Sequence, residues 1–279
     1  MKQIIAVHDL SGFGKCSLGV VMPTLAAMGV RACARPTAYL SAHTAFPPCE
    51  HAVFLDLTAQ MEATLAHWDE LHARFDGFYS GFLGAPEQME LLERCLSARR
   101  KDGFLAMVDP VMGDGGKPYR TYTPQLCDKM AELSTYADVI TPNLTEAAIL
   151  LGEDYDPAPN RKKAADWLHR LSLEGRRSVI LTGLSLTSGT LGAGCFDRTT
   201  GAVDFAQAPL AHGVFSGTGD LFASVAFGKL LAGEALPAAT QAAVSFVSLA
   251  ANATLDRGGD PVEGADFEPL LHLLAPHQV

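Results

Sequence analysis

The sequence FSGTGDLFASVAFG, residues 215–228, joins a glycine-rich turn directly to an apolar run with helical character. Gly217, Thr218 and Gly219 are small, so their backbone amides are unobstructed where the helix is expected to begin. The first turn of a helix has unpaired amides and the positive end of the helix dipole. This turn therefore predicts an anion-binding site, and we take it as the point around which the rest of the chain is organised.

Asp220 stands directly beside this predicted anion site, and two interpretations of it are open. A carboxylate in the first turn of a helix is favoured by the helix dipole, so Asp220 can be a capping residue. Alternatively, it can be a general base that takes a proton from a substrate hydroxyl while the amides hold the phosphoryl group being transferred.

Composition and charge exclude several classes of protein. The chain has 279 residues, with 21 Lys and Arg against 31 Asp and Glu, a net charge of −10 and a pI near 5.3. This balance argues against a protein of nucleic acids or membrane surfaces. No apolar run has the length of a membrane span, and the first apolar run is too short for a signal sequence. Six cysteines without Cys-x-x-Cys pairing indicate free thiols and a cytoplasmic location: Cys16, Cys33, Cys49, Cys95, Cys127 and Cys195.

Apolar strand patterns alternate with helical patterns along the whole chain. The pattern predicts an α/β fold with three layers (αβα), a mainly parallel central sheet covered on both faces, and a single domain over residues 1–279. A hairpin is expected over 191–206. The predicted strands are 3–7, 30–40, 76–80, 104–108, 137–140 and 178–181, and the predicted helices are 18–28, 57–75, 86–100, 124–134, 144–152, 161–173, 218–231, 237–255 and 267–274.

Polar residues follow the predicted strands, where ligands of parallel sheets bind. These residues are Ser11, Thr44, Asp109, Asp114, Asn143, Thr182 and Asp220. The first loop, residues 8–17, has two glycines but fits neither nucleotide motif, because Asp9 and Ser17 stand where those motifs need glycine. The glycines allow either close approach of a small molecule or a tight turn.

Two acids lie five positions apart in the glycine-rich loop after the fourth strand. Asp109 and Asp114 suit a hydrated magnesium ion, although a solvated acidic loop is an equal alternative. Asn143 and Glu146 form a pattern typical of a capping box, which does not prevent Glu146 from also reaching a metal. The spacing of His8, His43 and His51 fits no compact metal site.

Three motifs in order, DPVMGD at 109–114, TPNLTE at 141–146 and GTGD at 217–220, resemble those of the ribokinase superfamily, and within it the vitamin B6 kinases. The similarity runs from Val7 to about Leu255. It implies ATP-dependent phosphorylation of the 5′-hydroxymethyl group of a pyridine ring, with Asp220 as the base and the amides of Gly217, Thr218 and Gly219 as the anion hole.

The resemblance also implies the ligands. Mg2+ with ATP is expected at Asp114, Asn143 and Glu146, and a monovalent cation (K+ or Na+) near Asp109 and Thr141. Thr182 is expected beside the ATP phosphates. For the ring of the pyridine alcohol, the implied polar contacts are Ser11 and Thr44, and the implied apolar walls are Leu40, Phe46 and Phe82. Tyr119 is expected to supply a hydroxyl from the loop 109–119, which we call the flap. Because relatives are commonly dimers, a homodimer is expected.

The sequence departs from the family pattern at Ala42, Leu40 and Phe82, which leaves the choice among pyridoxal, pyridoxine and pyridoxamine open. Hydroxymethylpyrimidine kinase of thiamine synthesis shares the fold and reaction, but often has Cys at the position of Asp220. A non-catalytic regulator that binds a B6 vitamer or nucleotide is a further alternative. A sugar kinase would need a strand-rich lid, and residues 31–41 are expected to return to the main sheet and leave little room for one.

Overall fold

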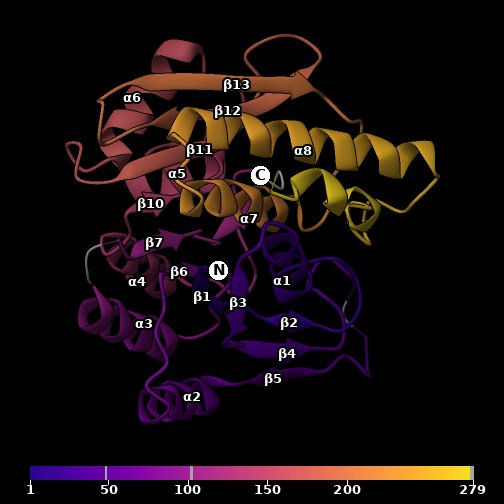
Figure 1. Cartoon of the computed structure of the whole chain (residues 1–279). Helices are drawn as coiled ribbons and strands as arrows, with labels where there is room; N and C mark the ends of the chain where they lie inside the picture. The colour runs from indigo at the N-terminus through magenta and orange to yellow at the C-terminus, as the bar shows by residue number, and fades with distance from the viewer. Residues whose placement is uncertain (48, 101–102, 277–279) are drawn as a thin grey trace.

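The computed structural model describes residues 1–47, 49–100 and 103–276, and it contains a central sheet of eight strands (Figure 1). Across the sheet the order is β13-β12-β11-β10-β7-β6-β1-β3. These strands are β1 (Gln3–Val7), β3 (Arg31–Ala34), β6 (Gly77–Ser80), β7 (Leu105–Val108), β10 (Val139–Ile140), β11 (Ser178–Leu184), β12 (Thr190–Phe196) and β13 (Val203–Pro209).

The sheet is mainly parallel, as predicted. Every neighbouring pair from β3 to β11 is parallel, whereas β12 pairs antiparallel with both β11 and β13. The antiparallel pair β12 and β13 is the predicted hairpin. Because the parallel strands end at the same edge, the loops that follow β1, β6, β7, β10 and β11 gather there.

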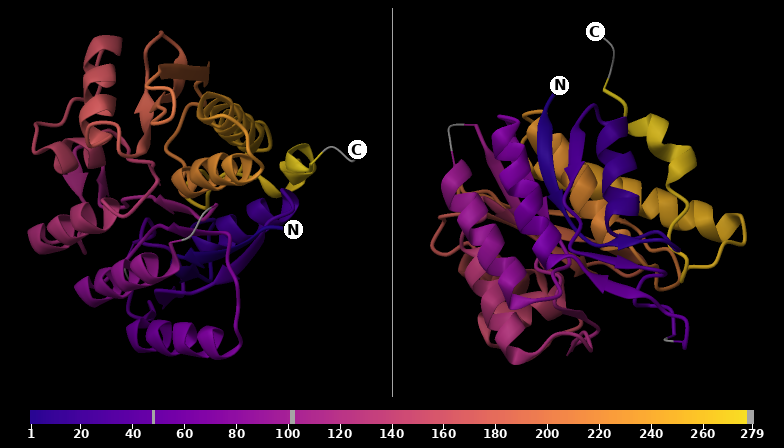
Figure 2. Two further views of the ribbon diagram at one scale, coloured as in Figure 1. Left: turned by 60° about the vertical axis from the view of Figure 1, so that its left-hand side comes forward. Right: turned by 90° about the horizontal axis from the view of Figure 1, so that it is seen from below.

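Helices cover both faces of the sheet, which confirms the three-layer arrangement (Figures 1 and 2). One face packs against α2 (Thr58–Glu70), α3 (Pro86–Arg99), α4 (Pro124–Ser134), α5 (Leu144–Leu151) and α6 (Arg161–Leu171). The other packs against α1 (Leu18–Ala27), α7 (Thr218–Leu231), α8 (Leu236–Asp256) and the 3-10 helix η1 (Glu268–Leu274).

Strand residues alternate between the two cores. In β1, Ile5 and Val7 pack on the side of α3, while Ile4 and Ala6 pack on the side of α1 and α7. All four are fully buried, because a strand between two helical layers has no solvent face. This explains why the strands read as continuous apolar runs.

A second, three-stranded sheet corrects the expectation for residues 30–41. The stretch 30–40 divides at Pro36 into β3 of the main sheet and β4 (Ala38–Leu40), which pairs instead with β2 (Leu10–Ser11) and β5 (Phe54–Asp56). The expected direct return to the main sheet is therefore wrong. Two further short strands, β8 (Gly113–Asp114) and β9 (Lys117–Pro118), form a hairpin in the acidic loop.

Across residues 1–47, 49–100 and 103–276, no helix combines the length and apolar character that crossing a bilayer requires.

Candidate active site

The glycine turn before α7 is fixed by its neighbours in space. Gly217 is the N-cap residue and has φ of 69°, a left-handed conformation that favours glycine. A Cβ atom on Gly217 would lie 1.9 Å from the backbone oxygen of Lys15. The first loop therefore packs directly on the turn, and the amides of residues 217–219 begin α7 as predicted.

Asp220 lies in the first turn of α7, with its side chain 15% exposed. Its Oδ2 atom accepts a hydrogen bond from the backbone N–H of Ser17 at 2.8 Å. Burial raises the pKa of Asp220 to about 7, with a smaller opposing effect of the Ser17 N–H and a further raising effect of the Asp9 charge. A carboxyl group with a pKa near neutrality can accept and release a proton at physiological pH.

Ser17 donates hydrogen bonds to two carboxylates, those of Asp220 and Asp9. Its φ of 52° is unusual for a residue with a side chain. While its N–H bonds to Asp220, its hydroxyl donates to Asp9, which also accepts from the Ser11 hydroxyl at 2.8 Å. Burial raises the pKa of Asp9, and the two hydroxyl donors oppose that effect. The predicted ring contact Ser11 is thus buried and held in place by Asp9.

Asp109 follows β7 and lies near Asp220. Burial raises the pKa of Asp109 to about 8, and the negative charge of Asp220 adds to this effect, while the Thr141 hydroxyl opposes it. Asp109 is 7% exposed and Thr141 is 3% exposed. Two buried carboxyl groups whose charges repel in this way cannot both ionise at low cost, so a cation near them would stabilise their charged forms.

Glu146 and Asn143 form the predicted capping box at the start of α5. The Asn143 side chain accepts from the amides of Thr145 and Glu146, and Glu146 Oε2 accepts from the Asn143 amide at 2.8 Å. Glu146 Oε1 also accepts from the Met112 amide at 3.1 Å. Both oxygens of this buried carboxylate therefore hold backbone amides, and they tie the acidic loop to α5.

The remaining residues of the predicted nucleotide side lie around this capping box. Asn143 Nδ2 donates to the Gly113 carbonyl at 2.8 Å, and the Thr182 amide donates to the Pro142 carbonyl at 2.9 Å. Asp114 is exposed in β8, and its Oδ1 accepts from the Gly115 amide. The strands β7, β10 and β11 thus bring the three predicted loops to one edge of the sheet.

The carboxylate oxygens at this edge are ligands of the kind that Mg2+ prefers. Among the described residues, no group of three or more His, Cys, Asp or Glu side chains is arranged to hold a metal ion directly. Mg2+ usually keeps several waters and binds one or two carboxylates together with phosphate oxygens. The carboxylates of Asp109, Asp114 and Glu146 are donors of the kind that this mode of binding uses.

Two of the predicted apolar ring contacts, Leu40 and Phe46, lie beside the first loop. Leu40 is buried and pairs with Ser11 and Phe54 in the small sheet. The Phe46 ring lies 4.6 Å from His43 and 5.3 Å from Phe13, measured between ring centroids.

Three other predicted ring contacts are more open to solvent. Phe82 is half-buried, Thr44 is exposed in the loop after β4, and Tyr119 is 39% exposed in the flap. Burial raises the pKa of the Tyr119 hydroxyl, and so do the charges of Glu146 and Asp114.

Comparison with known proteins identifies the family. The model of the phosphomethylpyrimidine kinase family matches residues 22–263, which is most of the chain. The chain belongs to the phosphomethylpyrimidine kinase family.

Relatives of this phosphomethylpyrimidine kinase family member include solved structures. A provisionally named phosphomethylpyrimidine kinase from Bacteroides thetaiotaomicron is 38% identical with a TM-score of 0.94, covering 100% of this chain and 96% of that chain. A second crystal form of that protein contains pyridoxal and gives 37% identity and a TM-score of 0.93. The fold is therefore that of the ribokinase-like α/β kinases, as predicted.

Two curated relatives are named as B6 kinases. The pyridoxine/pyridoxal/pyridoxamine kinase of Bordetella bronchiseptica is 30% identical over 266 residues, which cover 92% of this chain and 90% of that protein. A provisionally named pyridoxal kinase of Schizosaccharomyces pombe is 29% identical over 162 residues, and the match spans 46% of that protein's length. The family is one of phosphotransferases that use an alcohol group as acceptor.

Sequence reasoning missed several residues that this kinase fold places at the candidate site. His8 Nδ1 lies 3.8 Å from Asp220 Oδ1, and His43 is buried beside Phe46. Asp9 was considered only as a missing glycine. The available signal was position, because His8 and Asp9 directly follow β1 at the edge where the other polar loops end.

Cys16 also lies near the candidate site. From sequence, Cys16 is interpreted as a small packing residue at a helix start rather than as a thiol activated by Lys15, and in the structure burial and the charges of Asp220 and Asp9 raise its pKa. The Lys15 ammonium instead pairs with Asp266 and Glu268 in the C-terminal segment. These effects favour the neutral thiol of Cys16 over the thiolate.

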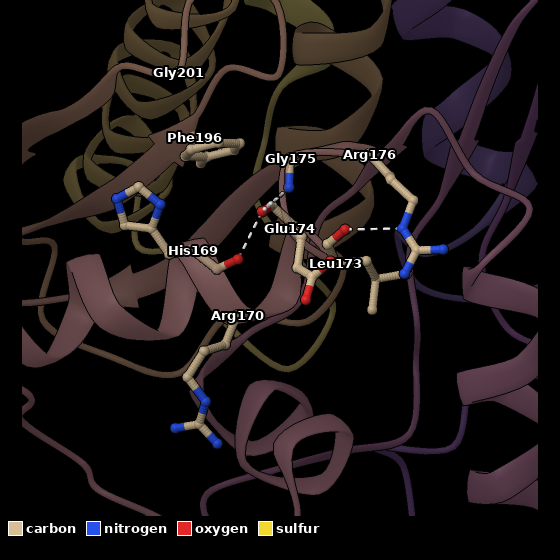
Figure 3. Close-up of a pocket in the computed structure, with 9 residues that line it drawn as sticks. His169, Arg170, Leu173, Glu174, Gly175, Arg176, Phe196 and Gly201 are labelled. Atoms are coloured by element: carbon tan, nitrogen blue, oxygen red, sulfur yellow. Dashed lines mark hydrogen bonds between the residues drawn. The ribbon is translucent and has the colours of Figure 1, made fainter.

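A separate hollow lies at the other edge of the sheet, where α6 ends and β11 begins (Figure 3). Some of its polar groups are bonded to one another: the Ser172 hydroxyl donates to the His169 carbonyl and accepts from the Gly175 amide, and the Arg176 guanidinium donates to the Leu173 carbonyl. This hollow shares no residue with the candidate active site.

Proposed function

We propose that this chain uses ATP to phosphorylate the 5′-hydroxymethyl group of pyridoxal, pyridoxine or pyridoxamine. The observation that carries the proposal is the placement of Asp220 beside the glycine turn, where Ser17 fixes one carboxylate oxygen and burial raises the pKa to about 7. The B6 kinase relative from Bordetella and the Bacteroides structure with pyridoxal support a pyridine alcohol as the substrate.

In the proposed reaction, Asp220 removes the proton of the substrate hydroxyl. The oxygen then forms a bond to the γ-phosphorus of ATP, the bond from that phosphorus to the β,γ-bridging oxygen breaks, and ADP leaves. The proton remains on Asp220 until it is released to solvent. General-base catalysis of this kind contributes about 10²- to 10⁴-fold to a rate.

The amides of Gly217, Thr218 and Gly219 would bind the phosphoryl oxygens as they carry negative charge in the transition state. Phosphoryl transfer depends mainly on positioning and charge neutralisation, and no covalent enzyme intermediate is needed. The left-handed conformation of Gly217, the N-cap residue, supports this role because it allows α7 to begin beside Asp220.

Mg2+ bound with ATP would neutralise the phosphate charges. We propose that Asp114, Asn143 and Glu146 hold it directly or through water, and that Asp109 and Thr141 lie near a monovalent cation, K+ or Na+. The carboxylates at this edge of the sheet, and the raised pKa of Asp109, support a cation here. Thr182 would contact the ATP phosphates.

For the ring, we propose Ser11 and Thr44 as polar contacts and Leu40, Phe46 and Phe82 as apolar walls, with Tyr119 contributing from the flap. Of these, Ser11 has the firmest support, since Asp9 fixes its hydroxyl. The full chain, residues 1–279, would form one kinase domain.

The experiment that tests the function measures ADP release with Mg2+ and ATP against pyridoxal, pyridoxine, pyridoxamine and hydroxymethylpyrimidine in one panel. Turnover of a B6 vitamer supports the proposal. Turnover of the pyrimidine alone would keep the catalytic roles but assign a thiamine precursor as substrate. Binding of a vitamer without any turnover would indicate a regulator.

We also propose a homodimer and a cytoplasmic location. Apolar side chains exposed on the small sheet, Leu10, Tyr39, Phe54 and Leu55, support association with a second copy. Light scattering after size-exclusion chromatography gives the mass in solution, and a mass near 29.6 kDa would contradict the dimer.

A further inference from the structure

His8 lies in the candidate site without an assigned role. It directly follows β1, it is fully buried, and neither of its ring nitrogens has a hydrogen-bond partner among the described residues. Its ring packs edge-on against Tyr79 at 4.4 Å between centroids. A buried polar group without a partner costs about 1–3 kcal/mol, so such a group calls for an explanation.

The position of the ring is maintained by its surroundings. A Cβ atom on Gly81 would lie 2.4 Å from His8 Nδ1, so a side chain at residue 81 would displace the imidazole. The backbone N–H of Gly81 bonds to Val7, which fixes this glycine against the end of β1. The His8 ring thus has room because Gly81, directly after β6, has no side chain.

The carboxylate of the proposed base faces His8. Nδ1 of His8 lies 3.8 Å from Oδ1 of Asp220, while Oδ2 of Asp220 already accepts from Ser17. One carboxylate oxygen is therefore fixed by a backbone amide, and the other faces an unpaired ring nitrogen. A shift of less than 1 Å would bring these atoms within hydrogen-bond distance.

We propose that His8 is a positioning residue for Asp220, donating from Nδ1–H of a neutral imidazole to Oδ1 of the carboxylate. This role rests on the proposed function of Asp220 as the base. Together with Ser17, His8 would hold both oxygens of the carboxylate, so that the lone pair that takes the substrate proton keeps one direction.

Neutrality of the imidazole matters for this role. Burial lowers the pKa of His8 to about 3, which favours the neutral imidazole that the proposed hydrogen bond requires. Asp220 interacts electrostatically with Asp109 after β7 and with Asp9 in the first loop, and both are negative when ionised. A neutral donor thus offsets part of their repulsion of the carboxylate.

The tautomer of His8 is tested directly by NMR of the full chain labelled with 15N-histidine. The His8 signals are identified by their absence in H8N. We expect a protonated Nδ1 and an unprotonated Nε2, with the Nδ1 signals displaced in D220A because the acceptor is gone. A protonated Nε2 with a bare Nδ1, or His8 signals unmoved by D220A, would overturn the inference.

Kinetics of two matched variants provide the second test. The side-chain amide of Asn can place its nitrogen where His has Nδ1, whereas Leu fills the space without a donor. A hydrogen bond to a charged group is worth about 1.5–3 kcal/mol, so we expect H8L to lose about 10- to 100-fold in kcat with little change in KM for ATP. We expect H8N to stay within about threefold of the wild type on the same scale.

Equal losses in H8N and H8L would show that His8 only fills space and would overturn the inference. If H8L does not fold, the NMR comparison of wild type and D220A decides the question alone. If the wild type turns over no B6 vitamer, the proposed function fails, while the NMR result still decides whether His8 donates to Asp220.

Discussion

The backbone amide of Ser17 lies 2.8 Å from Oδ2 of Asp220, although 203 residues separate them along the chain. The loop after the first strand therefore sets the orientation of a carboxylate on α7. Ser17 adopts a left-handed φ of 52° to do so, a conformation that surrounding contacts must maintain. The first loop and the glycine turn thus act as one unit.

Replacement of Asp220 by Asn should remove the base and keep the shape of the site. We expect D220N to lose about 10²- to 10⁴-fold in kcat, since the amide accepts no proton from the substrate. Isothermal titration calorimetry should show ATP and vitamer binding close to that of the wild type. Turnover near the wild-type level would leave Asp220 as a helix-capping residue.

Replacement of Gly217 by Ala should disturb both stability and catalysis. The left-handed conformation costs about 1–3 kcal/mol for a residue with a side chain, and the added Cβ would lie 1.9 Å from the Lys15 oxygen. We expect a lower Tm together with a large loss of turnover. Gly19→Ala in α1 is the control, because nothing lies within 4 Å of its Cβ position. Similar Tm values for the two variants would contradict the close packing of the turn.

The contribution of Asp220 and Asp109 to stability should fall as pH rises from about 4 to about 8, and comparison with D220N isolates the part due to Asp220 from that of other groups such as His8. Burial raises the pKa of Asp220 to about 7 and of Asp109 to about 8, from an ordinary value of 3.8, so the folded chain keeps protons that the unfolded chain releases in this range. D220N removes one of these protons, so its Tm should fall less over the same range. We expect the difference to reach at least about 1 kcal/mol, or about 2–4 °C, by calorimetry at pH 5 and pH 8. Parallel pH curves would refute the raised pKa of Asp220.

Replacement of Glu146 by Gln should separate its capping role from a role in binding magnesium. Gln keeps one acceptor oxygen, so one of the two backbone amides of Asn143 and Met112 loses its partner, at a cost of about 1–3 kcal/mol. If Glu146 also binds Mg2+ through water, the Mg2+ concentration for half-maximal turnover should rise.

The exposed E70Q is the control for the loss of a carboxylate, since Glu70 has no ion pair among the described residues, and neither quantity should change in it. A lower Tm with an unchanged magnesium titration would make Glu146 a helix cap alone.

The layered fold could be predicted because its signals are local. Each buried strand is a short apolar run, and each loop motif follows the end of a strand, as with Asp109 after β7 and Asn143 after β10. The capping box of Asn143 and Glu146 was predictable for the same reason, since it depends on residues three positions apart.

The small sheet could not be predicted from local patterns. Its strands β2 and β5 have two and three residues, and all three residues of β5 are exposed. They become strands only because β4 lies between them. Likewise, the contacts of Ser17 and His8 with Asp220 depend on how distant parts of the chain meet, and neither residue is part of a motif.

The ion pairs of Lys15 have a consequence for engineering. The Lys15 side chain pairs with Asp266 and Glu268, and its backbone amide donates to the Glu263 carbonyl. Lys15 lies two residues before Ser17, whose amide bonds to Asp220. A truncation that removed the segment from Glu263 onward would therefore loosen the loop that orients the proposed base, although the segment itself contains none of the kinase motifs. Affinity tags are better placed beyond Leu274, where η1 has already ended.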